Sequence, residues 1–238
     1  VVEDNGNYII AGDRYNGNIE KENAYFLRMN EFGDLLNTKE IKLPNEEFVY
    51  DIIQTSEGNL AFIGKTKNLE SVLDNTDNVF FGILNADLEE QVMTVIADTL
   101  DNEASALIET NDGNLVFIGV SQNPANGDSR DIYLRKIEKS GEPVWADPVY
   151  LGGLDSDQGT DIVEAPNGDL LICGYTRSQG MGSSDVYIHR LTADGAPVWT
   201  EPVIWGGANV DEATTIIQTL DGNFLVSGYS ESSNQNID

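Results

Sequence analysis

Histidine and thiol chemistry each depend on a single residue in this sequence, His189 and Cys173. His189 lies in a strand-like stretch between Ile188 and Arg190, with no second histidine to share a metal ion. A zinc site or a Ser-His-Asp triad needs more partners than that, so the sequence supports neither. Cys173 sits in the apolar run LLICG, which predicts a small buried core residue, and a single cysteine excludes an intramolecular disulfide.

Carboxylate chemistry is left open by the composition. The 238 residues include 41 Asp and Glu against 13 Lys and Arg, a formal net charge of -28. A glycosidase needs only two carboxylates, but in a chain so rich in acids their presence favours no particular reaction. A surface of this sign repels phosphate backbones, which argues strongly against a nucleic-acid partner. Solubility is the favoured explanation of the charge, and attraction of cations or basic partners and adaptation to salt are the alternatives.

Two acidic segments offer oxygen ligands to a hard cation such as calcium. They are residues 74–78 (DNTDN) and residues 155–157 (DSD). Neither has the twelve-residue spacing of an EF-hand loop with its terminal glutamate. We therefore expect polar solvated loops and no cofactor, with calcium binding as the alternative.

The elements that must position any site repeat along the chain. One hairpin recurs five times, as in IIQTSEGNL, LIETNDGNL and TIIQTLDGNF, with a glycine in each turn, where positive φ is needed. These turn glycines are spaced 52, 55, 55 and 54 residues, and they are Gly6, Gly58, Gly113, Gly168 and Gly222. A second glycine series keeps the same intervals: Gly12, Gly64, Gly119, Gly174 and Gly228.

Apolar runs between the two glycine series predict strands that are covered on both faces. They are residues 8–11, 60–63, 115–118, 170–173 and 224–227. A third strand is expected to open at Asn23, Asn78, Asp131 and Asp185, and to end in a turn at Gly33, Leu88, Gly141 and Gly195. A fourth strand is expected next, clearest in the two Pro-Val-Trp segments at residues 143–145 and 197–199.

Four short antiparallel strands in each period of roughly 54 residues, without a helix, describe the blade of a β-propeller. A two-sheet sandwich is the main rival, but it does not explain so constant a period. We expect an all-β, single-domain propeller over residues 1–238, with the strands ending at Ile53, Ile108, Val163 and Ile217 nearest the axis. The repeats cover approximately 1–48, 49–102, 103–158, 159–212 and, in part, 213–238. Because both chain ends carry hairpin copies, we expect a longer natural protein or a shortened final blade.

The repeat motif is also similar to a known one. The strings GG-x-x-x-D-x-A-x-x-I-I-x-T-x-D-G-N-x-x-x-x-G-Y and D-V-Y-x-x-R-L-x-x-D-G-x-P-V-W resemble a β-propeller repeat of secreted and surface-anchored bacterial proteins. Residues 159–238 fit best, and residues 1–102 keep the hairpin but lose the tryptophan and the glycine pair. The resemblance implies an extracellular, outer-membrane-associated protein, often a lipoprotein, and it adds no catalytic residue.

Residues repeated in register are predicted to hold the blades together rather than to react. They are Asp157, Asp211, Tyr133, Tyr187, Trp145 and Trp199. Binding is expected instead in the loops whose copies differ, residues 14–23, 65–78, 121–131 and 176–185, on the same face as residues 152–157 and 206–211. Aromatic and cationic candidates for contacts there are Tyr15, Tyr175, Arg177, Trp205 and Tyr229.

The sequence therefore favours a non-catalytic binding module on the bacterial surface, with a protein, peptide or glycan as its partner. An accessory lipoprotein of an outer-membrane complex is one setting. A carboxylate-dependent glycoside hydrolase or lyase is one alternative, and a structural or adhesive segment of a longer repeat protein is another. No run approaches the roughly 18 apolar residues of a membrane span, and no signal peptide is visible. A lipid anchor upstream of Val1 remains compatible with the sequence.

Overall fold

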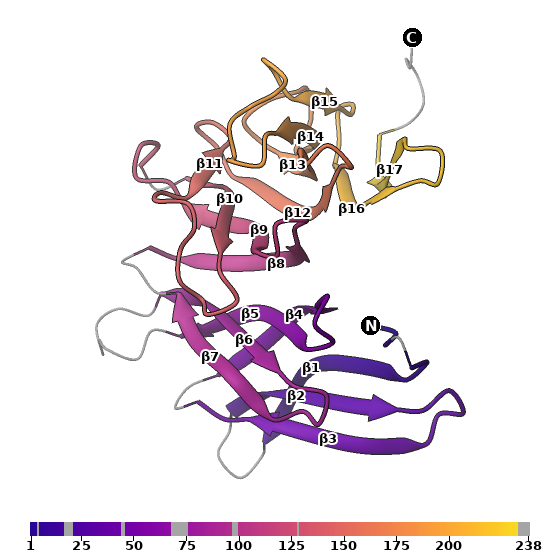
Figure 1. The fold of residues 1–238 in the computed structure, drawn as a ribbon. Helices are drawn as coiled ribbons and strands as arrows, with labels where there is room; N and C mark the ends of the chain where they lie inside the picture. The colour runs from indigo at the N-terminus through magenta and orange to yellow at the C-terminus, as the bar shows by residue number, and fades with distance from the viewer. Residues whose placement is uncertain are drawn as a thin grey trace.

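A computed structural model describes residues 1–3, 5–16, 21–43, 46–67, 76–96, 100–127 and 129–232. All regular structure in these residues is β-strand (Figure 1). No helix in the described part of the chain is long and apolar enough to cross a membrane. The strands are β1 (Tyr8–Asn16), β2 (Lys21–Met29), β3 (Leu35–Ile41), β4 (Glu47–Gln54), β5 (Leu60–Lys67), β6 (Asp77–Leu84), β7 (Glu90–Ile96), β8 (Asn102–Glu109), β9 (Leu115–Gln122), β10 (Arg130–Ile137), β11 (Val149–Leu151), β12 (Asp157–Glu164), β13 (Leu170–Thr176), β14 (Asp185–Leu191), β15 (Val203–Trp205), β16 (Asp211–Gln218) and β17 (Phe224–Ser230).

The strands form five antiparallel sheets, each in chain order. We number these sheets as blades: blade 1 is β1–β3, blade 2 is β4–β7, blade 3 is β8–β11, blade 4 is β12–β15, and blade 5 is the hairpin β16–β17. The first strands of successive blades, β4, β8, β12 and β16, contact one another, so they are the inner strands near the axis, as predicted. The fold is a β-propeller with five blade positions.

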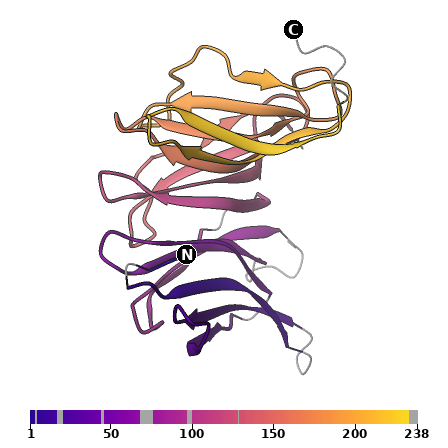
Figure 2. The same cartoon turned by 90° about the vertical axis from the view of Figure 1, so that its right-hand side faces the viewer.

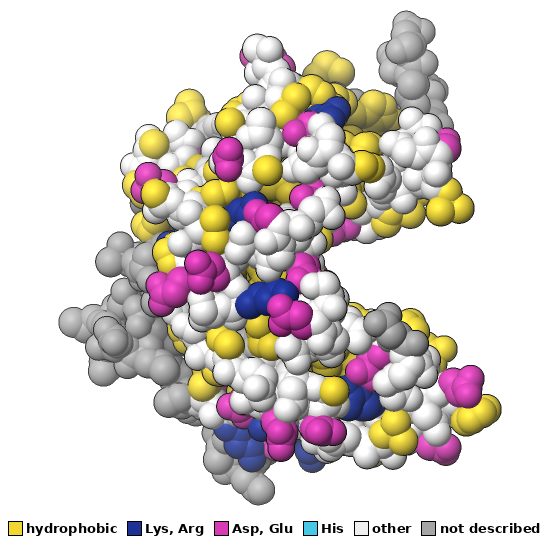
Figure 3. Space-filling view, in the orientation of Figure 1, with side chains coloured by type: hydrophobic (Ala, Val, Ile, Leu, Met, Phe, Trp, Pro, Cys, Tyr) yellow, Lys and Arg dark blue, Asp and Glu magenta, His cyan; other side chains and the backbone are white. Residues whose placement is uncertain are grey.

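The blades follow one another in an arc (Figures 1 and 2). Blade 1 lies at the bottom of Figure 1 and the β16–β17 hairpin at the upper right. The space-filling view shows a deep notch between these two parts (Figure 3). In the described chain, blade 1 and blade 5 therefore each have one face without a neighbouring blade.

Apolar clusters fill the spaces between successive blades. In the middle three copies the apolar runs are covered on both faces, as predicted: Leu60, Leu115 and Leu170 all have 0% exposure. In the first and last copies this prediction is wrong, because one face lacks a neighbour. Ile10 is 48% exposed and Leu225 is 55% exposed.

The two glycine series have different physical causes. All five hairpin-turn glycines have φ between +80° and +86°, and Leu88, which stands where other blades have Gly33, Gly141 and Gly195, adopts φ +62°. The second series instead permits close backbone approach beside a β-bulge in the inner strand. A Cβ on Gly119 would lie 2.0 Å from the Glu103 carbonyl oxygen, whereas a Cβ on Gly12 would meet nothing within 4 Å.

The fourth strand does not include the Pro-Val-Trp segments, so that prediction is wrong. Pro143 and Pro197 form only isolated bridges, and the fourth strands begin later, at Val149 and Val203. Proline has no N–H to extend a ladder, and the segment that follows it turns away from the sheet. Trp145 is buried there, with its ring beside Gly195 of the next blade.

Alanine at Gly119 should destabilise the propeller, because its Cβ would force the inner strand of blade 3 away from β9. We expect the unfolding free energy to fall by about 2 kcal/mol or more. Gly12→Ala is the matched control and should leave stability within about 0.5 kcal/mol of wild type. Urea unfolding followed by tryptophan fluorescence measures both variants, and equal stability of the two would contradict this explanation of the glycine series.

Cys173 should be unreactive in the folded protein. Its side chain is fully buried, and burial raises the pKa of the thiol to about 11, so little thiolate is present at pH 8. We expect no reaction with a disulfide reagent under native conditions and one thiol per chain in denaturant. Rapid native labelling would show that blades 4 and 5 separate readily.

Candidate functional site

Carboxylates on the inner strands join neighbouring blades. Asp51 accepts hydrogen bonds from the N–H of Leu107 in the next blade (2.7 Å) and from the N–H of Ile52 (2.8 Å). Asp161, at the same position of blade 4, accepts from the N–H of Ile216 (2.8 Å) and the hydroxyl of Thr215 (2.6 Å). Burial raises the pKa of Asp51, and the charge of Asp161 adds to that shift. These acids near the axis bind the backbone of the adjoining strand.

A second set of acids links blades 3 and 4 each to the blade before it. Glu109, at the end of β8, accepts from both the N–H and the hydroxyl of Ser56 in the turn of blade 2. Glu164, at the end of β12, accepts from the N–H of Asn111 in the turn of blade 3 (2.7 Å). Carboxylates in the middle of inner strands and at their last residue therefore act as interblade acceptors, which explains part of the acidity.

The structure gives the repeated aspartates a scaffold role. Asp157 is fully buried and accepts from the N–H of Gly153 (2.8 Å) and the hydroxyl of Ser178 (2.7 Å). Asp211 does the same with the N–H of Gly207 (2.7 Å) and the hydroxyl of Ser232 (2.6 Å). These bonds also place the loop after β13 beside residues 152–157, on one face, as predicted.

The other repeated residues are also scaffold by position. Tyr133 and Tyr187 have 1% and 2% exposure, Trp145 is buried, and Trp199 is partly buried. His189 packs beside Tyr187 and Trp199, at centroid distances of 6.1 and 6.3 Å. Burial lowers its pKa, so it stays neutral and acts as a packing residue.

A calcium site receives no support from the placement of these acids. Asp157 Oδ2 accepts from the donors described above, Asp157 Oδ1 accepts from the N–H of Arg177 (3.1 Å), and Asp155 is exposed. Among the described residues, no three His, Cys, Asp or Glu side chains are placed to hold a metal ion. Asp74 and Asn75 of the other candidate segment lie outside the described residues, as do parts of the variable loops 14–23 and 65–78.

Three of the predicted binding residues lie together near the loop end of the inner strands. The Tyr175 hydroxyl donates to Gln158 (2.9 Å), and the Arg177 guanidinium lies 5.8 Å from the Tyr175 ring centre. The Tyr229 hydroxyl donates to Glu212, which raises the pKa of Tyr229 to about 12. Ser184 also donates to Glu212, at 2.8 Å. This row of polar and aromatic groups forms a preorganised rim.

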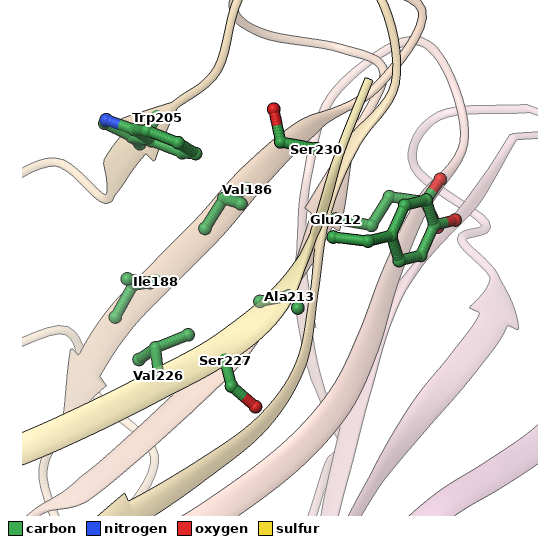
Figure 4. Close-up of a pocket in the computed structure, with 10 residues that line it drawn as sticks. Val186, Ile188, Trp205, Glu212, Ala213, Val226, Ser227 and Ser230 are labelled. Atoms are coloured by element: carbon green, nitrogen blue, oxygen red, sulfur yellow. The ribbon is translucent and has the colours of Figure 1, made fainter. Parts of the chain in front are cut away.

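Trp205 stands on the outer wall of a cavity that Glu212 and Tyr229 also line, and we call this cavity the slot. The slot is a space of about 340 Å³ between blade 4 and the β16–β17 hairpin (Figure 4). Its apolar walls come from β14, β15, β16 and β17, and they include Val186, Ile188, Trp205, Ala213 and Val226. Glu212 and Ser230 lie toward one end of it, and Gly228 and Tyr229 also line it.

The slot can hold an apolar or aromatic side chain. Trp205 remains 48% exposed there, so a large apolar surface faces solvent. Among the slot residues Glu212 is the only carboxylate, and Tyr229 and Ser184 already hold it. The arrangement suits binding and lacks the second carboxylate that glycoside hydrolysis uses.

The structure does not bring all five predicted binding residues together. Tyr15 is on β1 of blade 1, 61% exposed, and lies at the other end of the arc from blade 5 (Figure 1). The apolar slot residues Val186, Ile188 and Val226 were not predicted, because each belongs to a repeated strand position. These slot residues can be identified by comparing their strand register with that of the other blades.

Comparison with known proteins supports the fold. No protein-family model matches the sequence, and no curated protein does. Among solved structures, the chain is similar to a thermostable family-43 glycoside hydrolase, with a TM-score of 0.50 and 12% identity over 98% of this chain and 75% of that chain. At this identity the likeness shows a shared propeller fold and leaves the activity open.

Removal of an interblade carboxylate should lower stability. Asp161→Ala leaves the N–H groups of Ile162 and Ile216 without their side-chain acceptor, and we expect a loss of about 1–3 kcal/mol. Asp194→Ala, at an exposed turn, is the control and should be nearly neutral. Thermal or urea unfolding provides the measurement, and equal stability of the two variants would contradict an interblade role of Asp161.

Proposed function

We propose that this chain is a non-catalytic binding module that captures a polypeptide partner at the bacterial cell surface. The observation that carries the proposal is the slot, with the half-exposed Trp205 on one wall and Val226 on the other. Burying one large apolar side chain in such a site contributes about 1.5–3 kcal/mol. Tryptophan and tyrosine are also enriched among residues that dominate binding energy at protein interfaces.

The surface location is supported by the repeat motif, which resembles that of secreted and surface-anchored bacterial propellers. An accessory lipoprotein of an outer-membrane complex suits a rigid scaffold of this kind. The net charge of -28 favours a partner with a basic rim around an apolar anchor. Because charge steers association, we expect capture to weaken as salt increases.

A carboxylate-dependent glycoside hydrolase is the second candidate, and its support is the shared fold with a family-43 glycoside hydrolase. Its catalytic acids would be sought near the axis, where Asp51 and Asp161 lie on inner strands. Asp51 already accepts two hydrogen bonds and Asp161 three, from their own strands and from the next inner strand. The binding module is therefore the better-supported function.

Capture experiments with matched variants test the binding function. Immobilised protein is incubated with envelope extract of the source bacterium, and bound polypeptides are identified by mass spectrometry. We expect a defined polypeptide whose recovery falls at least tenfold with Trp205→Ala, a change that corresponds to about 1.4 kcal/mol. Tyr15→Ala, which removes a more exposed aromatic (61% against 48%) far from the slot, should retain the polypeptide. Recovery that is unchanged in Trp205→Ala would contradict a role for the slot.

The hydrolase alternative predicts a different result. Release of reducing ends from a panel of polysaccharides, abolished by Asp51→Asn or Asp161→Asn in protein that still folds, would establish it. We expect no release above that of heat-inactivated protein. Circular dichroism of both variants checks that any loss is not caused by unfolding.

A further inference from the structure

His189 is the single histidine of the chain, and it lies inside blade 4. It stands on β14 and is 4% exposed. The imidazole packs perpendicular to the ring of Tyr187 and beside the ring of Trp199. Its Nδ1 atom is buried and has no hydrogen-bond partner among the described residues. A neutral ring suits this site, whereas an imidazolium there would be a charge in largely apolar surroundings.

Trp199 belongs to the segment between β14 and β15, residues 192–202, which we call the blade 4 connection. The Trp199 ring holds this connection against the blade, through its contacts with His189 and with the apolar cluster between blades 4 and 5. Three backbone hydrogen bonds also shape the turn: they run from the N–H groups of Thr192, Gly195 and Val198 to the carbonyl groups of Ala196, Thr192 and Arg190, at 2.7, 2.9 and 2.8 Å. His189 therefore supports the connection as well as β14.

Glu201, on the same connection, carries the charge that acts on His189. Burial lowers the pKa of His189, and the Glu201 carboxylate raises it, with burial the larger effect. Glu201 is exposed to solvent, so water screens its charge. The carboxylate therefore compensates only in part for the burial of an imidazolium.

Other charged side chains on the elements around His189 are directed elsewhere. Arg190 of β14 and Lys136 of blade 3 each pair with an aspartate at 2.7 Å. Asp185, at the start of β14, accepts from two backbone N–H groups of the preceding loop, and Asp194 is exposed at the turn. The strands β13 and β15 carry no Asp, Glu, Lys or Arg. The closed site therefore favours the neutral imidazole.

Blade 3 has the same turn without a titratable imidazole. Its segment between β10 and β11, residues 138–148, is the blade 3 connection, and it contains the buried Trp145. The three backbone hydrogen bonds recur there, from the N–H groups of Glu138, Gly141 and Val144, at 2.8, 2.9 and 2.8 Å. At the position of His189, two residues after the repeated tyrosine, blade 3 has Arg135. An arginine keeps its charge throughout the pH range in which imidazole titrates.

We propose that His189 is a proton sensor for the blade 4 connection. When the imidazole binds a proton from solvent, it leaves its site beside Tyr187 and Trp199, becomes hydrated, and residues 192–202 open. Trp199 then loses one of the two contacts that hold it. This inference is independent of the binding function proposed above.

The direction of the effect follows from proton linkage. The pKa of His189 in the closed form is below its ordinary value of 6.5, so the open form binds more protons. The closed form is therefore fully favoured above that value and loses stability as the pH falls through it. Each pH unit below about 6.5 raises the opening constant by up to about tenfold, until the closed form also takes the proton. Most carboxylates titrate lower, near about 4.

An NMR titration of the imidazole tests the first step, because the chain has one histidine and hence one set of imidazole signals. We expect the folded protein to titrate below the ordinary histidine value, and the urea-unfolded protein to titrate at it. Titration of the folded protein at or above the ordinary value would overturn the inference.

Amide hydrogen exchange tests the opening, with the blade 3 connection as an internal control. Exchange is read by mass spectrometry and corrected for its intrinsic dependence on pH. Between pH 7.5 and pH 5, we expect protection of residues 192–202 to fall at least about fivefold relative to that of residues 138–148. An equal change in the two connections, or no change in either, would contradict a sensor in blade 4.

His189→Leu assigns the effect to the imidazole. Leucine stands at this position in blade 1, as Leu27, and it carries no charge at any pH. The ratio of protection between the two connections should then stay constant from pH 7.5 to pH 5. If His189→Leu does not fold, His189→Gln provides the same test with a neutral polar side chain. Acid sensitivity that persists in the folded neutral variant would assign it to carboxylates and overturn the inference.

Discussion

Coverage of both faces of each blade is the constraint on which this structure depends. The strands β5, β9 and β13 carry unbroken apolar runs, so their sheets are stable only between two neighbours. The glycines beside the inner-strand bulges, the buried aspartates and the third-strand aromatics all serve that stacking. Where a neighbour is absent, in blades 1 and 5, apolar side chains such as Ile10 and Leu225 meet solvent. The two end blades therefore each expose apolar side chains of a strand that is buried in the middle blades.

The acidity of the chain has two physical roles that composition alone does not separate. Part of it is structural, because Asp51, Glu109, Asp161 and Glu164 accept backbone or hydroxyl hydrogen bonds across the blade interfaces. Because neighbouring blades are separate sheets, no strand ladder joins them, and these carboxylates supply hydrogen bonds between them. Asp157 and Asp211 are buried and bind loop donors, whereas exposed acids such as Asp155 and Asp194 keep a repetitive β-protein soluble and make its sheet edges repel one another.

The sequence predicted the propeller because its signals are local and repeated. Turn glycines such as Gly113 require positive φ, and the four-residue apolar runs require two-sided cover. The fourth strand was misplaced because Pro-Val-Trp has strand-like composition, while proline cannot extend the ladder. The slot was not predicted because Val186 and Val226 occupy strand positions that are apolar scaffold positions in the other repeats. Their exposure depends on which neighbour is present, and a repeat pattern does not encode that.

The interblade carboxylates also make the joints of the arc unequal. Blades 2 and 3 are joined by Asp51 and Glu109, whereas at the Asp51 position blade 3 has Ala106, which leaves Glu164 as the inner-strand carboxylate between blades 3 and 4. A load that pulls blades 1 and 5 apart is carried through all the joints in series. Of these two joints, the one between blades 3 and 4 should therefore yield first, because apolar packing bears most of its tension.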